Sequence, residues 1–154
     1  MRRAGRSAAT ILDRLCSFIR PGMSTLEVDE AGGDLMKDLG VKSACKGYRS
    51  GHRIFPSYTC LSVNDEVVHG IGVKERILKD GDVISVDVCI REDGMIGDNC
   101  RTIGVGAVSP EIERLLKVTE ESLFKGMAQA LHKNRVGDVS QAVQDLSLIH
   151  ISEP

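Results

Sequence analysis

The feature that most constrains the fold is a β-hairpin predicted over residues 83–105. Apolar side chains occupy every even position from Ile84 to Ile90, which is the period of a half-buried strand. A turn-forming Glu-Asp-Gly sequence follows at 92–94, and residues 95–105 return as the second strand. Any fold of this chain must therefore contain a sheet built around this hairpin.

Each strand of the hairpin carries an aspartate, Asp87 on the first strand and Asp98 on the second. They are an odd number of residues apart, so any hairpin loop with an even residue count places both carboxylates on the same face. As direct or diagonal neighbours, their Cβ atoms would lie roughly 5–8 Å apart. Two ionised carboxylates repel unless a cation lies between them, so a divalent-metal site is one interpretation. Two solvated surface aspartates are the other.

Composition limits the class of protein. A chain of 154 residues with 42% hydrophobic residues is one domain or a large part of one. The net charge of −2 gives no electrostatic reason to expect nucleic acid as a partner, and no apolar run approaches the ~20 residues that span a membrane. Five cysteines without a Cys-x-x-Cys pair favour free thiols in a reducing compartment, so we expect a cytoplasmic protein.

Two helices are predicted before the hairpin. Apolar residues recur at helical spacing over residues 4–19, and Pro21 ends this pattern. Ser24 and Glu27 form a capping box that opens a second helix, which ends at Gly40.

Short strands and further helices complete a chain of mixed α and β structure. Ser109 and Pro110 fit the N-cap and first turn of a long helix, and another short helix is expected near Val139. Short strands are expected at residues 41–44, 60–63 and 66–68.

Three sequence segments carry a resemblance to a known family. Residues 60–71, Cys-Leu-Ser-Val-Asn-Asp-Glu-Val-Val-His-Gly-Ile, resemble the Cys-x-Ser-x-Asn-Glu…His-Gly-Ile segment of type I methionine aminopeptidases. Asp87 and Asp98 follow in the order, spacing and glycine-flanked context of that family. The similarity runs from about Arg2 to Gln144, and it favours the metal interpretation of the two aspartates.

The resemblance implies an α/β (α+β) pita-bread aminopeptidase fold, of which the chain would hold the first half and the start of the second. In such a fold Asp87 would chelate one or both of two divalent ions (cobalt, manganese, iron or zinc), and Asp98 would bridge them. Metal-activated water would then remove the initiator methionine of nascent polypeptides. The resemblance also implies a soluble monomer, with the ribosome as a further candidate partner.

The resemblance assigns the substrate contacts as well. His69 matches a histidine that contacts the substrate near the scissile amide, and it is expected to act on substrate rather than to ligate metal. Four residues match the pocket for the methionine side chain, and soft sulfur and aromatic groups suit a thioether. These residues are Cys45, Tyr48, Phe55 and Cys60.

Two positions depart from the family pattern. The stretch Arg49–Ile54 is longer than the common family loop, which alters the rim of the expected pocket. Cys89 stands where many members carry a threonine that orients metal-bound water, and a thiolate there would favour softer ions.

The C-terminal end of the chain departs most from the family pattern. The family requires a further histidine and two glutamates, and at family spacing they would fall beyond Pro154. Residues 146–154 resemble a translated sequencing adapter instead of the family, so we divide the chain into a methionine aminopeptidase-like portion, 1–145, and a non-native tail, 146–154. We therefore expect the parent protein to be the enzyme, and this chain to be inactive and poorly stable.

Two other functions remain open. One is a peptidase on the same fold that cleaves before proline or acts on creatine-like substrates. The other is a non-catalytic pita-bread protein that binds a partner such as the ribosome. Asp87 and Asp98 argue against the latter, because a pure binding module has no need of two facing carboxylates.

Overall fold

The computed structural model describes residues 1–150, with side chains described through Leu146. It divides into two units, residues 1–108 and the residues from Ser109 onward. The first unit contains α1 (Arg2–Phe18), α2 (Thr25–Asp38), β1 (Lys42–Ser43), β2 (Arg49–Ser50), β3 (Arg53–Ile54), β4 (Cys60–Val63), β5 (Val83–Glu92) and β6 (Met95–Gly104). The second contains α3 (Pro110–Ala128) and α4 (Val136–His150).

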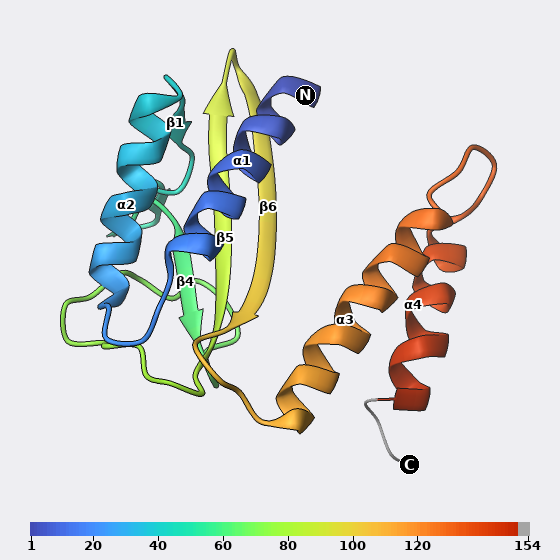
Figure 1. The fold of residues 1–154 in the computed structure, drawn as a ribbon. Helices are drawn as coiled ribbons and strands as arrows, with labels where there is room; N and C mark the ends of the chain where they lie inside the picture. The colour runs from blue at the N-terminus through green and yellow to red at the C-terminus, as the bar shows by residue number, and fades with distance from the viewer. Residues whose placement is uncertain (151–154) are drawn as a thin grey trace. The chain divides into compact units, whose positions relative to one another are not determined.

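The predicted hairpin is present as β5 and β6, and it organises the sheet (Figure 1). Its turn consists of Asp93 and Gly94, whose φ angles of 48° and 77° are those that a two-residue turn between twisted strands requires. Both β4 and β1 pair antiparallel with β5, with β4 at Ile84–Asp87 and β1 at Ile90–Arg91. These two short strands therefore share the edge of β5 that β6 leaves free.

One face of this sheet is covered by α1 and α2. Figure 1 shows α1 lying across β5 and β6, with α2 beside it near β1 and β4. The predicted apolar face of β5 is fully buried here against α1 residues such as Ile11 and Leu15. Because the hydrophobic core lies on this face, the alternate residues of β5, including Asp87, point to the other face.

The predicted helix ends are confirmed. The Ser24 hydroxyl accepts the Glu27 N–H, and the Glu27 carboxylate accepts the Ser24 N–H, which completes the capping box of α2. Gly40 follows α2 with a φ of 68°, which suits glycine. The Ser109 hydroxyl caps α3 through the Ile112 N–H.

Two predictions in the first unit need correction. The expected strand at 66–68 is absent, because Gly70 occupies the edge of β4 by accepting the Leu61 N–H. Val67 and Val68 are exposed, so their apolar character does not reflect burial. The longer stretch Arg49–Ile54 was expected as a loop and instead forms the small β2–β3 hairpin.

The second unit is a pair of packed helices. At Gly126 of α3, an added Cβ would lie 2.7 Å from a methyl of Val143, so glycine permits the close approach of α4. The helix expected near Val139 begins at Val136 and continues to His150, so the first part of the proposed 146–154 tail is helical. Residues 151–154 lie outside the described residues. Within residues 1–150, no helix is both long and apolar enough to cross a lipid bilayer.

Candidate metal centre and substrate site

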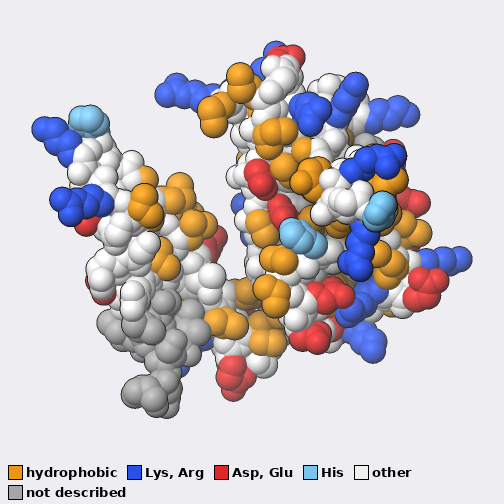
Figure 2. All heavy atoms as spheres, turned by 180° about the vertical axis from the view of Figure 1, so that it is seen from behind, with side chains coloured by type: hydrophobic (Ala, Val, Ile, Leu, Met, Phe, Trp, Pro, Cys, Tyr) orange, Lys and Arg blue, Asp and Glu red, His pale blue; other side chains and the backbone are white. Residues whose placement is uncertain are grey.

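Asp87 and Asp98 lie diagonally across the β5–β6 hairpin, on the same face. Asp87 is opposite Cys100, and Asp98 is opposite Cys89. The sequence prediction of a same-face pair is therefore confirmed, and the register selects the diagonal arrangement from the two that it allowed. Viewed from behind, the first unit presents acidic and histidine side chains among hydrophobic ones (Figure 2).

Asp87 has an unusual environment for a carboxylate. Its Oδ1 is buried and has no hydrogen-bond partner among the described residues. Burial raises the pKa of Asp87, the negative charge and hydrogen bonding of Asp98 raise it further, and His69 opposes this shift. A buried carboxylate oxygen is stabilised by a proton or a cation, so the Asp87 side chain is suited to hold either one.

Asp98 is exposed, in contrast to the half-buried Asp87. It nevertheless shares the face of the sheet with Asp87. Within the described residues, no group of three or more histidine, cysteine or acidic side chains is arranged to hold a metal ion. The two aspartates therefore fit part of a metal site, and a complete coordination shell needs further donors.

Cys89 and Cys100 lie opposite the two aspartates in the hairpin register. Burial raises the pKa of Cys89 to about 12 and that of Cys100 to about 11, and the charges of Asp87 and Asp98 add to both shifts. Both side chains are therefore neutral thiols at neutral pH before any cation binds. A thiolate ligand at Cys89 would form only if a cation displaced its proton.

Cys45 and Cys60 are also brought to this face. Cys60 is opposite Asp87 on β4, and its side chain is hydrogen-bonded to that of Cys45. This hydrogen bond lowers the pKa of Cys45 and raises that of Cys60, because one thiol donates to the sulfur of the other.

His69 is held beside Asp87 by an irregular loop. Its φ of 60° is uncommon for a residue with a side chain, and its imidazole is exposed. The next residue, Gly70, donates its N–H to the Ser62 hydroxyl at 3.1 Å, and the Leu61 N–H donates to the Gly70 carbonyl. His69 is thereby fixed alongside β4, within electrostatic range of Asp87.

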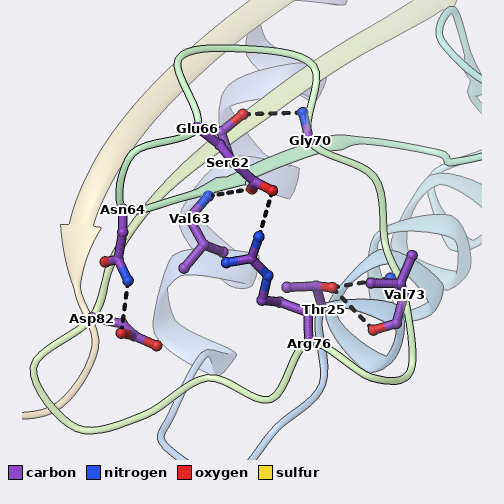
Figure 3. Close-up of polar contacts among 9 residues, drawn as sticks. All are labelled: Thr25, Ser62, Val63, Asn64, Glu66, Gly70, Val73, Arg76 and Asp82. Atoms are coloured by element: carbon purple, nitrogen blue, oxygen red, sulfur yellow. Dashed lines mark hydrogen bonds and ion pairs between the residues drawn. The ribbon is translucent and has the colours of Figure 1, made fainter.

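A charged pair fastens the remainder of this loop (Figure 3). The Glu66 carboxylate accepts the Val63 N–H at 2.8 Å and the Arg76 guanidinium at 2.6 Å. Asn64 donates to Asp82 at 2.9 Å and links the loop to the start of β5.

Tyr48 and Phe55 occupy the segment that contains the β2–β3 hairpin. The Phe55 N–H donates to the Tyr48 carbonyl, and the Tyr48 N–H donates to the Cys45 carbonyl, each at 2.9 Å. Phe55 is half-buried, whereas Tyr48 is 64% exposed. Backbone hydrogen bonds thus join Tyr48 to Cys45 and Phe55 to Tyr48, and no hydrogen bond joins either aromatic residue to Cys60 among the described residues.

Asp29 is a supporting residue that the sequence did not reveal. Its buried carboxylate accepts the N–H groups of Tyr58 and Thr59, which lead into β4 and Cys60. It falls on the buried face of α2, and an acidic residue on an otherwise core-facing stripe is the signal that could have identified it.

The fold and the paired carboxylates correspond to a class of metal-dependent peptidase. The chain belongs to metallopeptidase family M24, whose profile matches residues 1–147. Membership in this family implies a divalent-metal cofactor.

Particular relatives within this class are methionine aminopeptidases. Methionine aminopeptidase 1 of Bacillus subtilis is 42% identical over 144 residues, which cover 94% of this chain and 56% of the relative. Methionine aminopeptidase of Clostridium acetobutylicum is 39% identical over 145 residues, again 94% of this chain and 56% of the relative. The chain therefore spans about half the length of the curated relatives that it matches.

Solved structures support the expected pita-bread fold. The crystal structure of methionine aminopeptidase from Thermotoga maritima matches with a TM-score of 0.86 and 37% identity, over 95% of this chain and 57% of that one. An Escherichia coli aminopeptidase P structure matches with a TM-score of 0.79 at 20% identity, over 97% of this chain and 32% of that one, and shows the shared fold alone.

Proposed function

We propose that this chain carries part of the active site of a methionine aminopeptidase, an enzyme that removes the N-terminal methionine of newly made polypeptides. The observation that carries the proposal is the buried, unpartnered Oδ1 of Asp87 beside the diagonal carboxylate of Asp98. The names of relatives that are 34–42% identical support the choice of substrate.

Asp87 and Asp98 are the proposed metal ligands. The resemblance favours two divalent ions from among cobalt, manganese, iron and zinc, and carboxylate oxygens are suitable donors for such ions. When bound, the ions would generate a nucleophile from water at neutral pH and polarise the scissile carbonyl. The remaining ligands would come from residues outside those described.

The other candidate residues would position the substrate. His69, fixed on its loop near Asp87, would donate a hydrogen bond near the scissile amide. Cys45, Cys60, Tyr48 and Phe55 would contact the methionine side chain, whose thioether packs well against sulfur and aromatic groups.

The proposal is tested by hydrolysis of a Met-Ala-Ser peptide with added Mn²⁺ or Co²⁺. We expect no turnover from the 154-residue chain, because two carboxylates leave the coordination of a divalent ion incomplete. The full-length gene product should turn over the peptide. In that gene product, Asp87→Asn or Asp98→Asn should lower kcat/KM by more than about 100-fold. This loss exceeds the usual effect of replacing a residue that only hydrogen-bonds to a metal ligand.

Asp93→Asn is the matched control for these two variants. Asp93 is an exposed turn residue of the same hairpin, and asparagine tolerates its positive φ. This variant should retain activity. Ready turnover by the 154-residue chain, or full activity of Asp87→Asn in the gene product, would contradict the proposed role.

The choice of peptide substrate distinguishes a methionine aminopeptidase from a peptidase that cleaves before proline. An enzyme with that specificity would cleave an Ala-Pro peptide faster than Met-Ala-Ser. We expect the reverse, because the methionine aminopeptidases match at about twice the sequence identity of the aminopeptidase P structures. A protein that binds metal but cleaves neither peptide would favour the non-catalytic alternative.

We also propose a monomeric, cytoplasmic enzyme that meets its substrates as they leave the ribosome. The five cysteines support the compartment, because they are unpaired throughout the described residues and free thiols persist in reducing surroundings. Cosedimentation of the full-length protein with translating ribosomes, together with its mass in solution, would test the partner and the oligomeric state.

A further inference from the structure

Cys45 and Cys60 come from separate segments that meet along one edge of β5. The Ala44 N–H donates to the Cys89 carbonyl at 2.9 Å, and Cys60 pairs with Asp87. The two segments therefore contact β5 at positions only two residues apart. Their convergence follows from the register of the sheet, independently of the side chains.

A single hydroxyl fastens the two segments to each other. Ser43 Oγ donates to the Tyr58 carbonyl at 2.7 Å and accepts the Cys45 N–H at 3.1 Å. Tyr58 lies two residues before Cys60, so this hydroxyl holds the backbones on both sides of the thiol pair. Neither Cys45 nor Cys60 is part of a disulfide.

We infer that Cys45 and Cys60 form a redox-active dithiol, which a low-molecular-weight disulfide such as oxidised glutathione converts into a Cys45–Cys60 disulfide. Cys45 follows β1 in an irregular segment and is half-buried, so a small oxidant can reach it. Cys60 is held in β4 and is buried. Cys45 is therefore the attacking residue and Cys60 the resolving one.

The reaction balances as thiol–disulfide exchange. The Cys45 sulfur attacks one sulfur of oxidised glutathione, forms a mixed disulfide and releases one glutathione thiol. The Cys60 sulfur then attacks the Cys45 sulfur and releases the second glutathione. The protein loses two electrons and two protons, which reduce one oxidised glutathione to two glutathione thiols.

The sheet geometry disfavours two pairings that involve Cys100. Cys45 also lies close to Cys89, because the Ala44 N–H donates to the Cys89 carbonyl, so the peptide map has to distinguish a Cys45–Cys60 from a Cys45–Cys89 disulfide. Cys89 and Cys100 are diagonal neighbours roughly 7–8 Å apart, whereas the Cα atoms of a disulfide usually lie about 4.4–6.8 Å apart. Cys60 and Cys100 flank β5 on opposite sides, about 9–10 Å apart. Cys16 lies on α1 against the core.

The test is mass spectrometry of the reduced 154-residue chain after exposure to oxidised glutathione. We expect a protein that has lost two hydrogens and carries no glutathione, with a peptide map that joins Cys45 to Cys60. Cys60→Ala should instead accumulate one glutathione on Cys45, because the resolving thiol is missing. Cys45→Ala should form no internal disulfide.

Cys16→Ser is the matched control, and it should oxidise as the unchanged chain does. The same reaction in urea controls for folding, since an unfolded chain pairs its five cysteines without selectivity. Three outcomes would overturn the inference. They are a disulfide between Cys45 and Cys89, unselective pairing of the cysteines in the folded chain without urea, and stable glutathione adducts on the unchanged chain. These readouts are independent of peptidase activity, so they stand or fall separately from the proposed function.

Discussion

At the scale of single residues, Asp29 supports the site from inside the core. Both of its carboxylate oxygens are used, one by the Tyr58 N–H at 3.1 Å and the other by the N–H and hydroxyl of Thr59, each at 2.8 Å. These bonds hold the entry to β4 and therefore the position of Cys60. Asp29 thus links α2 to the segment that leads into β4.

We expect Asp29→Ala to destabilise the first unit, because it leaves buried donors unpaired. The cost is about 1–3 kcal/mol for each such donor. The matched control is Glu30→Ala at the adjacent, exposed position, which should change stability by less than about 0.5 kcal/mol. Urea unfolding of both variants measures the difference, and equal midpoints would contradict the role of Asp29.

Asp82 makes folding sensitive to acid. Its pKa is lowered from the ordinary 3.8, first by the hydrogen bond from the Asn64 side chain and then by that from the Lys79 N–H. A carboxylate whose pKa is lower in the folded state than in the unfolded state stabilises the fold at pH values above its unfolded-state pKa. This stabilisation is lost as the pH falls through the folded-state pKa. We expect the stability difference between the unchanged chain and Asp82→Asn to shrink below about pH 4. Urea midpoints from pH 6 to pH 3 test this, and a constant difference would contradict it.

At the scale of elements, the contact between α1 and β6 depends on glycine. An added Cβ at Gly97 would collide with the carbonyl oxygen of Ala4, and this backbone atom cannot turn aside. By contrast, a Cβ at Gly5, on the same helix as Ala4, would meet nothing within 4 Å.

Gly97→Ala should therefore destabilise the first unit by about 1–3 kcal/mol or more, as overpacking does. Gly5→Ala is the matched control and should stabilise α1 by about 0.5–1 kcal/mol, because alanine favours the helix. Thermal unfolding, monitored by circular dichroism, measures whether each variant raises or lowers the melting temperature. Equal melting temperatures for the two variants would show that α1 can shift away from β6.

At the scale of the whole molecule, the second unit exposes an apolar stripe. Several large hydrophobic side chains of α3 are 45–59% exposed. They are Leu115, Leu123, Phe124 and Met127.

We expect the 154-residue chain to bind the dye ANS through this stripe. Replacing Leu123 and Phe124 together by serine should lower the dye fluorescence without changing the unfolding midpoint of the first unit, whose core cluster ends at Val105. Glu121→Ser, an exposed change on the same helix, is the control and should leave the fluorescence unchanged. Undiminished fluorescence in the double variant would place the dye elsewhere.

The local sequence pattern was sufficient to predict several features of the fold. The alternation of β5 and the parity of Asp87 and Asp98 predicted one hairpin with both carboxylates on one face, because side chains alternate along any strand. The capping box at Ser24 and Glu27 depends on neighbouring residues and was equally readable. The prediction of a strand at residues 66–68, which contain two valines, was wrong. Gly70 occupies the edge of β4 there, because its carbonyl accepts the Leu61 N–H.

The sequence alone therefore determined what short-range geometry dictates: the helices, the hairpin, the facing aspartates and the family resemblance. Only the tertiary structure decided that Asp87 Oδ1 is buried without a partner among the described residues, that Asp29 holds the entry to β4, and that the segments of Cys45 and Cys60 meet at Ser43. The physical reason is that burial and contact between distant segments depend on which edge of β5 each segment occupies. That choice is made by packing of the whole sheet against α1 and α2, and no local pattern encodes it.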